Sequence, residues 1–523
     1  IVFKILKPFI YKNFQYFSLW IFLCFFLQIL IGFKLIEKIT KDYNFSFFSS
    51  LLLLLTPFLL FRLTHHFSLG AHWIILYSLY IAYFIPVDKQ KSHWYFVILI
   101  SLMTHLYFTV MIFVIYIFNF FENLYQRKSK KVEIKNLLLK IIFALLIMYI
   151  LGYFESHPIN AVSSGYGIFK IDIFSFFDPQ LDNGESWSLL LPNLAGTHLE
   201  GFTYLGLGNI LLIFLSIIIF FGKKFLHINQ TLTFQILRPL NLCFVLFIIW
   251  ALTTNISILG IEIISVNLPK YLFAILSIFS STGRFAWPFI YFMIIVSIFF
   301  LYRSFSKKVS FSIIISLICI QLLDISFKIF NNSLNEKKSH AIKSNDEIWK
   351  TIDDEFKIIR TTFLFNNYGP LFSNFSKILG ELENIKTDII LNAAMDRKKA
   401  AQVRYNLIEN INNEKLPTDT AYIIDNLGHL KQLKKQFSEK NYGFLFRDNF
   451  WMVLPGKKEL MNSLDINNFN KIKINEMELN KKYNLRFKDD FLGFGWTHNF
   501  SKQGVLYYNL NPVKINYRKS NHC

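Results

Sequence analysis

The chain has 523 residues, of which 53% are hydrophobic and 17% are charged, and its formal net charge at pH 7 is +20. Soluble domains are about 25% charged, so this composition indicates a membrane protein and excludes a mainly disordered chain, a collagen and a coiled coil. The four cysteines have no zinc-ligand spacing and the basic residues form no stripe interleaved with aromatics, so neither a zinc site nor a nucleic-acid partner is predicted.

Charge is distributed unevenly along the chain. Residues 1–330 contain 25 Lys and Arg against 13 Asp and Glu, whereas residues 331–523 contain 30 against 22. This contrast predicts a multi-span transmembrane domain over 1–330 followed by a charged globular region. Strand and helix patterns divide that region into a soluble α/β domain over 331–456 and a partial β-rich module over 457–523. The chain begins at Ile1 with an apolar pattern already under way, so we expect its true N-terminus to lie upstream.

Long apolar runs predict the membrane helices, because a hydrocarbon core of ~30 Å requires about 20 helical residues. The runs cover residues 15–33, 46–62, 70–86, 94–121, 136–153, 206–221, 241–254, 286–302 and 309–326. The run 94–121 is too long for one untilted helix and has a polar break at Thr104 and His105, so one crossing and two crossings both stay open. The weakly apolar stretch 263–280 predicts a re-entrant or interfacial segment.

Basic residues in short loops indicate the cytoplasmic side of a membrane. The loops 122–135, 222–240 and 303–308 are basic, whereas the loop 154–205 contains six acids and one lysine. We therefore predict that loop 154–205 and the region after residue 327 lie outside the cytoplasm.

The C-terminal region shows strand-like runs separated by helical patterns. The strand-like runs cover 358–365, 387–391, 421–424, 443–447 and 450–453, and helical patterns cover 398–412 and 427–439. Residues 483–487 alternate in polarity as a strand does, and 492–496 are rich in glycine and aromatics. The chain has no GxGxxG motif and no P-loop, so a nucleotide site is not predicted. A packing or spacer role for this region is favoured over sugar binding.

The loop sequence GESWSLLLPNLAGTHLEGFTYLGLG, residues 184–208, combines acids, aromatics, a histidine and five glycines just before an apolar run. Carboxylates at a membrane surface can accept hydrogen bonds from sugar hydroxyls or take part in acid–base chemistry. This composition makes Glu185, His198 and Glu200, together with Asp182 just before the stretch, candidates for substrate binding. A solvated loop with turn glycines is the alternative.

Two further groups lie near predicted span ends. Arg284, in STGRFAWP, precedes a span on the predicted outer side, against the positive-inside tendency, and a guanidinium suits bidentate binding of phosphate. An interfacial, snorkelling arginine is an equally good interpretation. His66 belongs to the sequence HHFSLGAHW, whose spacing suits a metal but which brings no acid or cysteine, so an interfacial role is favoured.

Four stretches together resemble one polytopic family. They are FQYFSLWIFLCFFLQIL from Phe14, RLTHHFSLGAHWIIL over 62–76, LPNLAGTHLEGFTYLGLG over 191–208 and STGRFAWP over 281–288. The chain resembles the bacterial membrane family of domain of unknown function 6311 over residues 1 to about 500, including GFGWTHN at 493–499. That family is similar in layout to the GT-C superfamily of glycosyltransferases.

The resemblance implies a GT-C-like helical bundle that transfers a sugar from a polyprenyl-phosphate donor to an envelope glycan or lipid acceptor. It implies location in the bacterial inner membrane with a periplasmic C-terminal region. It makes residues 15–33 the second span, so the catalytic acid of the first outer loop would lie upstream of Ile1, and a divalent cation stays open. A flippase for a lipid-linked saccharide and a non-catalytic assembly protein are the alternatives.

Overall fold

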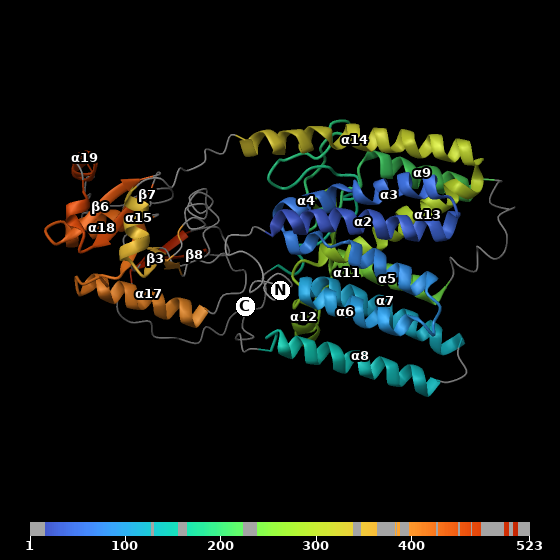
Figure 1. Cartoon of the computed structure of the whole chain (residues 1–523), viewed down its shortest axis with the longest axis horizontal. Coiled ribbons are helices and arrows are strands. Elements are labelled where there is room, and N and C mark those ends of the chain that lie inside the picture. Colours follow the sequence, from blue (N-terminus) through green and yellow to red (C-terminus); the bar gives the residue numbers. More distant parts are fainter. Residues whose placement is uncertain are drawn as a thin grey trace. The chain divides into compact units, whose positions relative to one another are not determined.

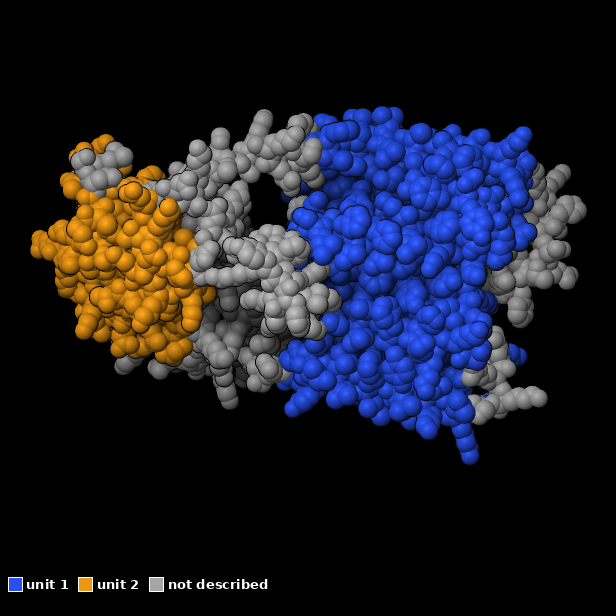
Figure 2. Space-filling model, viewed as in Figure 1, with its two compact units in different colours: residues 1–338 blue, residues 339–523 orange. Residues whose placement is uncertain are grey.

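A computed structural model of the chain places most of its residues. It describes residues 16–126, 130–154, 165–222, 238–337, 347–362, 382, 384–387, 397–424, 427–447, 450–461, 463–471, 496–500 and 506–510. The chain divides into two compact units, Ile1–Lys338 and Ser339–Cys523, which Figure 2 colours separately.

The first unit is a bundle of helices that run side by side (Figure 1). The longer helices are α2 (Phe17–Thr40), α3 (Tyr43–Leu54), α5 (Trp73–Phe84), α6 (Gln90–Thr104), α7 (Leu106–Gln126), α8 (Lys130–Ile150), α9 (Leu207–Phe221), α11 (Leu242–Leu252), α13 (Trp287–Ser304) and α14 (Lys307–Lys337). Shorter helical pieces are α4 (Pro57–His65), η2 (Phe67–Gly70), η4 (Pro239–Asn241), α12 (Lys270–Leu276) and η5 (Thr282–Ala286). Each of the nine predicted apolar runs therefore overlaps helix, and two of them, 46–62 and 94–121, contain a break between two helices.

Among the described residues, five helical segments are long and apolar enough to cross a membrane. They are Phe17–Thr40, Phe67–Phe84, Leu106–Tyr125, Thr282–Ser304 and Lys307–Phe330. A sixth is obtained if the bent pair Tyr43–Leu54 and Pro57–Thr64, which turns by 58°, is counted as one span. The helices α9 and α11 are apolar but shorter. The first unit thus has the length and composition of a multi-pass membrane domain.

Local sequence explains where these helices break. Pro57 opens α4 after an extended Thr56, since proline has no N–H to continue α3 but fits the first turn of a new helix. The predicted break at Thr104 and His105 is confirmed, because α6 ends at Thr104 and His105 is extended at φ −158° and ψ 135°. The Thr104 hydroxyl donates to the carbonyls of Ile100 and Ser101, at 2.9 and 3.0 Å.

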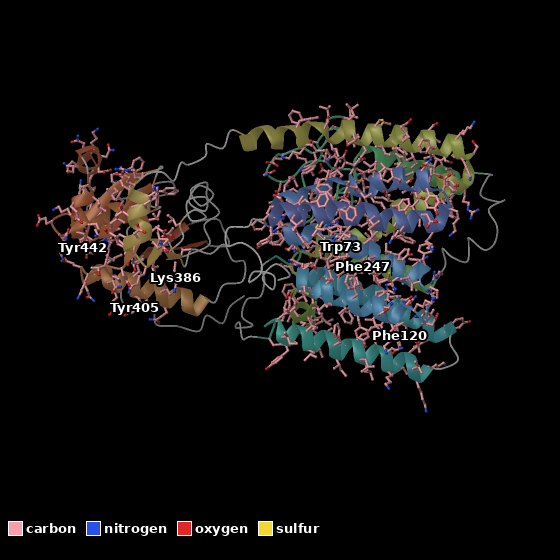
Figure 3. The ribbon with its side chains drawn as sticks, in the orientation of Figure 1. Trp73, Phe120, Phe247, Lys386, Tyr405 and Tyr442 are labelled. Carbon is pink, nitrogen blue, oxygen red and sulfur yellow. The ribbon has the colours of Figure 1, made fainter. Side chains whose placement is uncertain are left out.

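One continuous apolar core holds the bundle together. Helix α2 packs on α3 and α5, α9 packs on α13 and α14, and α6 packs on α7. Trp73 on α5 and Phe247 on α11, labelled in Figure 3, are 6% and 0% exposed. Burying an aromatic or branched side chain contributes about 1.5–3 kcal/mol, so this core fixes the helix ends that carry the polar groups described below.

Residues 165–206 form an irregular loop at one end of the bundle. We call this end of the bundle, at which α4 ends and α5 and α7 begin, the loop end. Beside it lies a hairpin of β1 (Asn255–Ile258) and β2 (Ile261–Ser265). Asp324 on α14 is 0% exposed and holds the loop against α14 by hydrogen bonds. Its carboxylate accepts hydrogen bonds from the Tyr204 hydroxyl at 2.6 Å, the Leu207 amide at 3.0 Å and the Ser188 hydroxyl.

The second unit is built on a five-stranded sheet in the order β4-β3-β5-β7-β6. Its strands are β3 (Ile358–Thr361), β4 (Lys386–Thr387), β5 (Thr420–Ile424), β6 (Tyr442–Arg447) and β7 (Phe450–Pro455). The strands β8 (Trp496–Phe500) and β9 (Leu506–Leu510) form a separate two-stranded antiparallel sheet. Strand β3 is parallel to β4 and β5, and β7 is antiparallel to β5 and β6. The helices are α15 (Glu347–Glu355), α17 (Arg397–Asn412), α18 (Leu427–Phe437), η6 (Lys458–Leu460) and α19 (Ser463–Lys471).

Four of the five predicted strand runs and both predicted helical patterns of this unit coincide with these elements, apart from their ends. Strand β3 ends earlier than the predicted run 358–365, and most of 387–391 lies outside the described residues. The predicted alternation at 483–487 and the glycine-rich 492–495 also lie outside them.

Candidate functional site

Two glycines bring distant parts of the chain together at the loop end. The Gly283 amide donates to the Phe169 carbonyl at 2.9 Å. A Cβ on Gly283 would lie 2.7 Å from the Gly201 Cα, and a Cβ on Gly201 would lie 2.0 Å from the Lys170 carbonyl oxygen. Three backbone segments can approach this closely only because glycine has no side chain. The contact places Glu200, which precedes Gly201, beside Arg284, which follows Gly283.

The Glu200 carboxylate lies between two guanidinium groups. Its Oε2 is 2.8 Å from Arg284 Nε and 2.6 Å from Arg284 Nη2, and it is 3.0 Å from Arg62 Nη1. The side chains of Arg62, Arg284 and Glu200 are 0%, 8% and 14% exposed. We call these three residues the arginine cluster. Two positive charges and one negative charge leave it a net charge of +1.

Aromatic side chains hold both arginines in place. The Arg62 guanidinium carbon lies 5.0 Å from the Phe61 ring centre and 5.7 Å from the Trp287 ring centre. The corresponding atom of Arg284 lies 4.5 Å from the Tyr107 ring centre. Stacking on these faces stabilises a guanidinium that has lost its water. Arg62 comes from α4, Tyr107 from α7 and Arg284 from η5, so three elements meet at the cluster.

Burial alone would raise the pKa of Glu200, but Arg62 and Arg284 outweigh it and lower the pKa from 4.5 to about 2. Opposite charges within hydrogen-bond distance favour the ionised carboxylate. Glu200 is therefore a permanent anion at physiological pH and a weak base.

The cluster has more donors than acceptors. Arg62 Nη2 donates to the Leu199 carbonyl at 2.7 Å. Its Nε is buried and has no hydrogen-bond partner among the residues that the structure describes. The surplus of donors, together with the net positive charge, makes this a place where an anion would be stabilised.

Histidines border the cluster. His66 Nε2 is 3.6 Å from Glu200 Oε1, and because the His66 side chain is 53% exposed, the cluster meets the molecular surface there. His105, in the break between α6 and α7, contacts the Tyr107 ring at 5.4 Å between ring centres. The Tyr107 amide donates to His105 Nδ1 at 3.3 Å, which leaves the proton of a neutral imidazole on Nε2.

The structure separates the residues singled out from the sequence into three groups. Glu200, Arg284 and His66 belong to or border the arginine cluster. His198 accepts the Glu200 amide on Nδ1 at 3.2 Å, but its Nε2 faces Asp182 Oδ2 at 3.7 Å, so these two form a neighbouring pair. Glu185 lies apart and is paired with Lys328 on α14 at 2.6 Å.

Sequence reasoning did not identify Arg62 or His105 as site residues. Arg62 is the one charged residue in the apolar run 46–62, and a charge in such a run indicates either function or a buried partner. That partner is 138 positions away, and only the folded chain shows it. His72 of the same histidine group lies in the core, with Nδ1 2.9 Å from the Tyr291 hydroxyl, so it does not form a ligand set with His66.

No group of three or more His, Cys, Asp and Glu side chains is arranged to hold a metal ion within the described part of the chain. The arginine cluster has the opposite chemistry, since guanidinium groups repel a cation. The open question of a divalent cation therefore has no candidate position among these residues.

Residues 1–326 match the family described as domain of unknown function DUF6311. The match covers more than half of the 523 residues, so the chain belongs to this family. No curated protein and no solved structure matches the chain.

Proposed function

We propose that this protein is a membrane glycosyltransferase that takes its sugar from a polyprenyl-phosphate donor and transfers it to a cell-envelope acceptor. One observation carries the proposal: a buried cluster of two arginines and one glutamate, with a net charge of +1, lies at the loop end of a bundle of apolar helices. A lipid-linked phosphate combines an apolar chain, which suits the helices, with an anion, which suits the arginines.

In the proposed reaction, an acceptor hydroxyl attacks the anomeric carbon of the donor sugar. The new bond joins the acceptor oxygen to that carbon, the bond to the phosphate oxygen breaks, and polyprenyl phosphate leaves with the electron pair. Negative charge therefore develops on the phosphate, where fixed guanidinium groups stabilise it. The acceptor hydroxyl gives its proton to a base outside the arginine cluster, because both guanidinium groups are already protonated and Glu200 is too weak a base.

Glu200 has a different role in this proposal. With a pKa of about 2 it is too weak a base to take a proton from a hydroxyl. It instead neutralises one of two guanidinium charges that would repel each other, and it fixes their direction. We therefore propose Glu200 as a positioning residue and Arg62 and Arg284 as the phosphate-binding residues.

The test is sugar transfer in membrane vesicles that contain the full-length protein and a radiolabelled polyprenyl-phosphate sugar. Arg284→Ala is expected to abolish transfer and Arg284→Lys to retain part of it, since lysine keeps the charge but loses the bidentate geometry. Lys328→Ala is the matched control, because it removes a cation that is paired with Glu185 outside the cluster. Equal transfer by Arg284→Ala and wild type would refute the proposal.

A flippase for a lipid-linked saccharide is the second candidate, and one observation favours it. Helices α3 and α4 form a pair bent by 58°, and Arg62 lies on the second member. Broken helices near a binding site are typical of transporters. Movement of a fluorescent lipid-linked saccharide across vesicles, without formation of a glycosylated product, would favour this candidate over the transferase.

A further inference from the structure

Segment 255–278 of the first unit carries an unusually apolar exposed surface. Six of its side chains, Ile261, Ile263, Val266, Tyr271, Ile275 and Ile278, are between 52% and 69% exposed. Glu262 and Lys270 are its only charged residues. A two-stranded hairpin is marginally stable in water, and an exposed apolar surface of this kind marks a contact with lipid or with protein.

Fixed contacts prevent this surface from folding inward. Leu259 and Gly260 form the two-residue turn of the hairpin with φ of 49° and 79°. The Asp172 carboxylate accepts both of their amides, at 3.1 and 3.0 Å. The Ile173 amide also donates to the Ser257 carbonyl at 3.1 Å. The hairpin is thus tied to the loop by its tip and its edge, and its isoleucines stay outside.

The depth of the segment follows from its two ends. Trp250, near the end of α11, stacks on Phe285 of η5 with 4.1 Å between ring centres. Phe285 lies near the start of the candidate span Thr282–Ser304. The segment therefore leaves the bundle and returns to it at the level where an apolar span begins. Figure 1 shows α12 beside the loop end of the bundle.

The apolar surface also continues that of the preceding helix. On α11 the side chains of Leu242, Val245, Leu246 and Ile249 are 48–59% exposed and repeat at helical spacing. This helix has no charged residue, so the stripe suits lipid. The hairpin starts three residues after α11 ends, about 10 Å of extended chain, which keeps it near the boundary of the hydrocarbon.

From these observations we infer that segment 255–278 rests in the lipid leaflet at the loop end, with its isoleucines and Tyr271 among the acyl chains. The bilayer covers this apolar surface, as it covers the apolar face of an interfacial amphipathic helix. The segment leads directly into Ser281 and Arg284, so it forms a lipid-seated rim next to the arginine cluster. The inference does not depend on sugar transfer, since a protein without that activity would seat its hairpin in the same way.

The test measures the surroundings of single labelled positions in nanodiscs. Cys319 and Cys523 are replaced by serine, while Cys24 and Cys243 are buried and stay. Cysteine is then introduced at Ile263 or Ile275 and labelled with nitrobenzoxadiazole. Ile249→Cys on α11 is the lipid control and Glu439→Cys on the second unit is the water control, and far-UV circular dichroism confirms folding of each variant.

We expect lipids that are spin-labelled on the acyl chain to quench positions 263 and 275 to the extent that they quench position 249. Iodide in the water is expected to quench both positions far less than it quenches position 439. Quenching by iodide as at position 439 would overturn the inference. Protection from both quenchers would also overturn it, because the surface would then be covered by protein, for example by a second copy of the chain.

Discussion

Replacing Glu200 by glutamine removes the one negative charge of the arginine cluster and keeps the size of the side chain. Arg62, which is 0% exposed, and Arg284 would then face each other without a counter-charge. The pKa of Glu200 falls from 4.5 to about 2 on folding, and at 1.36 kcal/mol per pKa unit this corresponds to about 3 kcal/mol of stabilisation. Removal of one partner from a buried pair costs ~3–5 kcal/mol, which agrees.

The assay is reversible unfolding of wild type and Glu200→Gln in detergent, followed by circular dichroism. Glu185→Gln is the matched control: it makes the same chemical change in the same loop, but Glu185 is 46% exposed and paired with Lys328. An exposed pair contributes below about 1 kcal/mol. The reasoning is refuted if the two variants lose equal amounts of unfolding free energy.

Three further results are expected. Because folding lowers the pKa of Glu200, the stabilisation from its carboxylate is present above pH 4.5 and is lost as the pH falls toward 2. The unfolding free energies of wild type and Glu200→Gln should therefore converge only in that acidic range, and a change in their difference near neutral pH would contradict this. Gly201→Ala should destabilise by about 1–3 kcal/mol, because its Cβ would lie 2.0 Å from the Lys170 carbonyl oxygen, and an unchanged melting temperature would show that the backbones are not in contact. Alkaline phosphatase fused after Lys328 should be active, since the basic loops predict that this end of α14 lies outside the cytoplasm, and inactivity at normal expression would reverse the orientation.

The apolar helices were predictable because a long apolar run is a local property of the sequence. The break at Thr104 and His105 was visible for the same reason, as two polar residues interrupt an apolar run. The stretch 263–280, predicted to be re-entrant or interfacial, contains part of a β-hairpin and the short helix α12, and that form was not predicted. The turn at Leu259 and Gly260 has no Asn-Gly or Asp-Gly signal, and its positive φ values are supported by Asp172 from another segment.

The arginine cluster could be predicted only in part. Glu200 and Arg284 stood out by their loop and by their charge, but their pairing depends on the contact of Gly201 with Gly283. The residues around Gly201 and Gly283 in the sequence do not predict that the two glycines are in contact. Sequence reasoning did not single out Arg62, the one charge in the apolar run 46–62, because its partner Glu200 is 138 positions away and only the folded chain brings the two together. Long-range packing, rather than local pattern, builds this site.

The central claim, that the arginine cluster binds the phosphate of a lipid, is tested most directly by binding of a polyprenyl-phosphate analogue to purified full-length protein in nanodiscs. The account predicts that wild type binds the phosphate lipid and not the neutral polyprenol. It also predicts that Arg284→Ala loses ~2–5 kcal/mol of binding free energy, roughly 30-fold to several thousand-fold in affinity, while Arg284→Lys loses less. Equal affinity of folded Arg284→Ala and wild type for the phosphate lipid would contradict the claim.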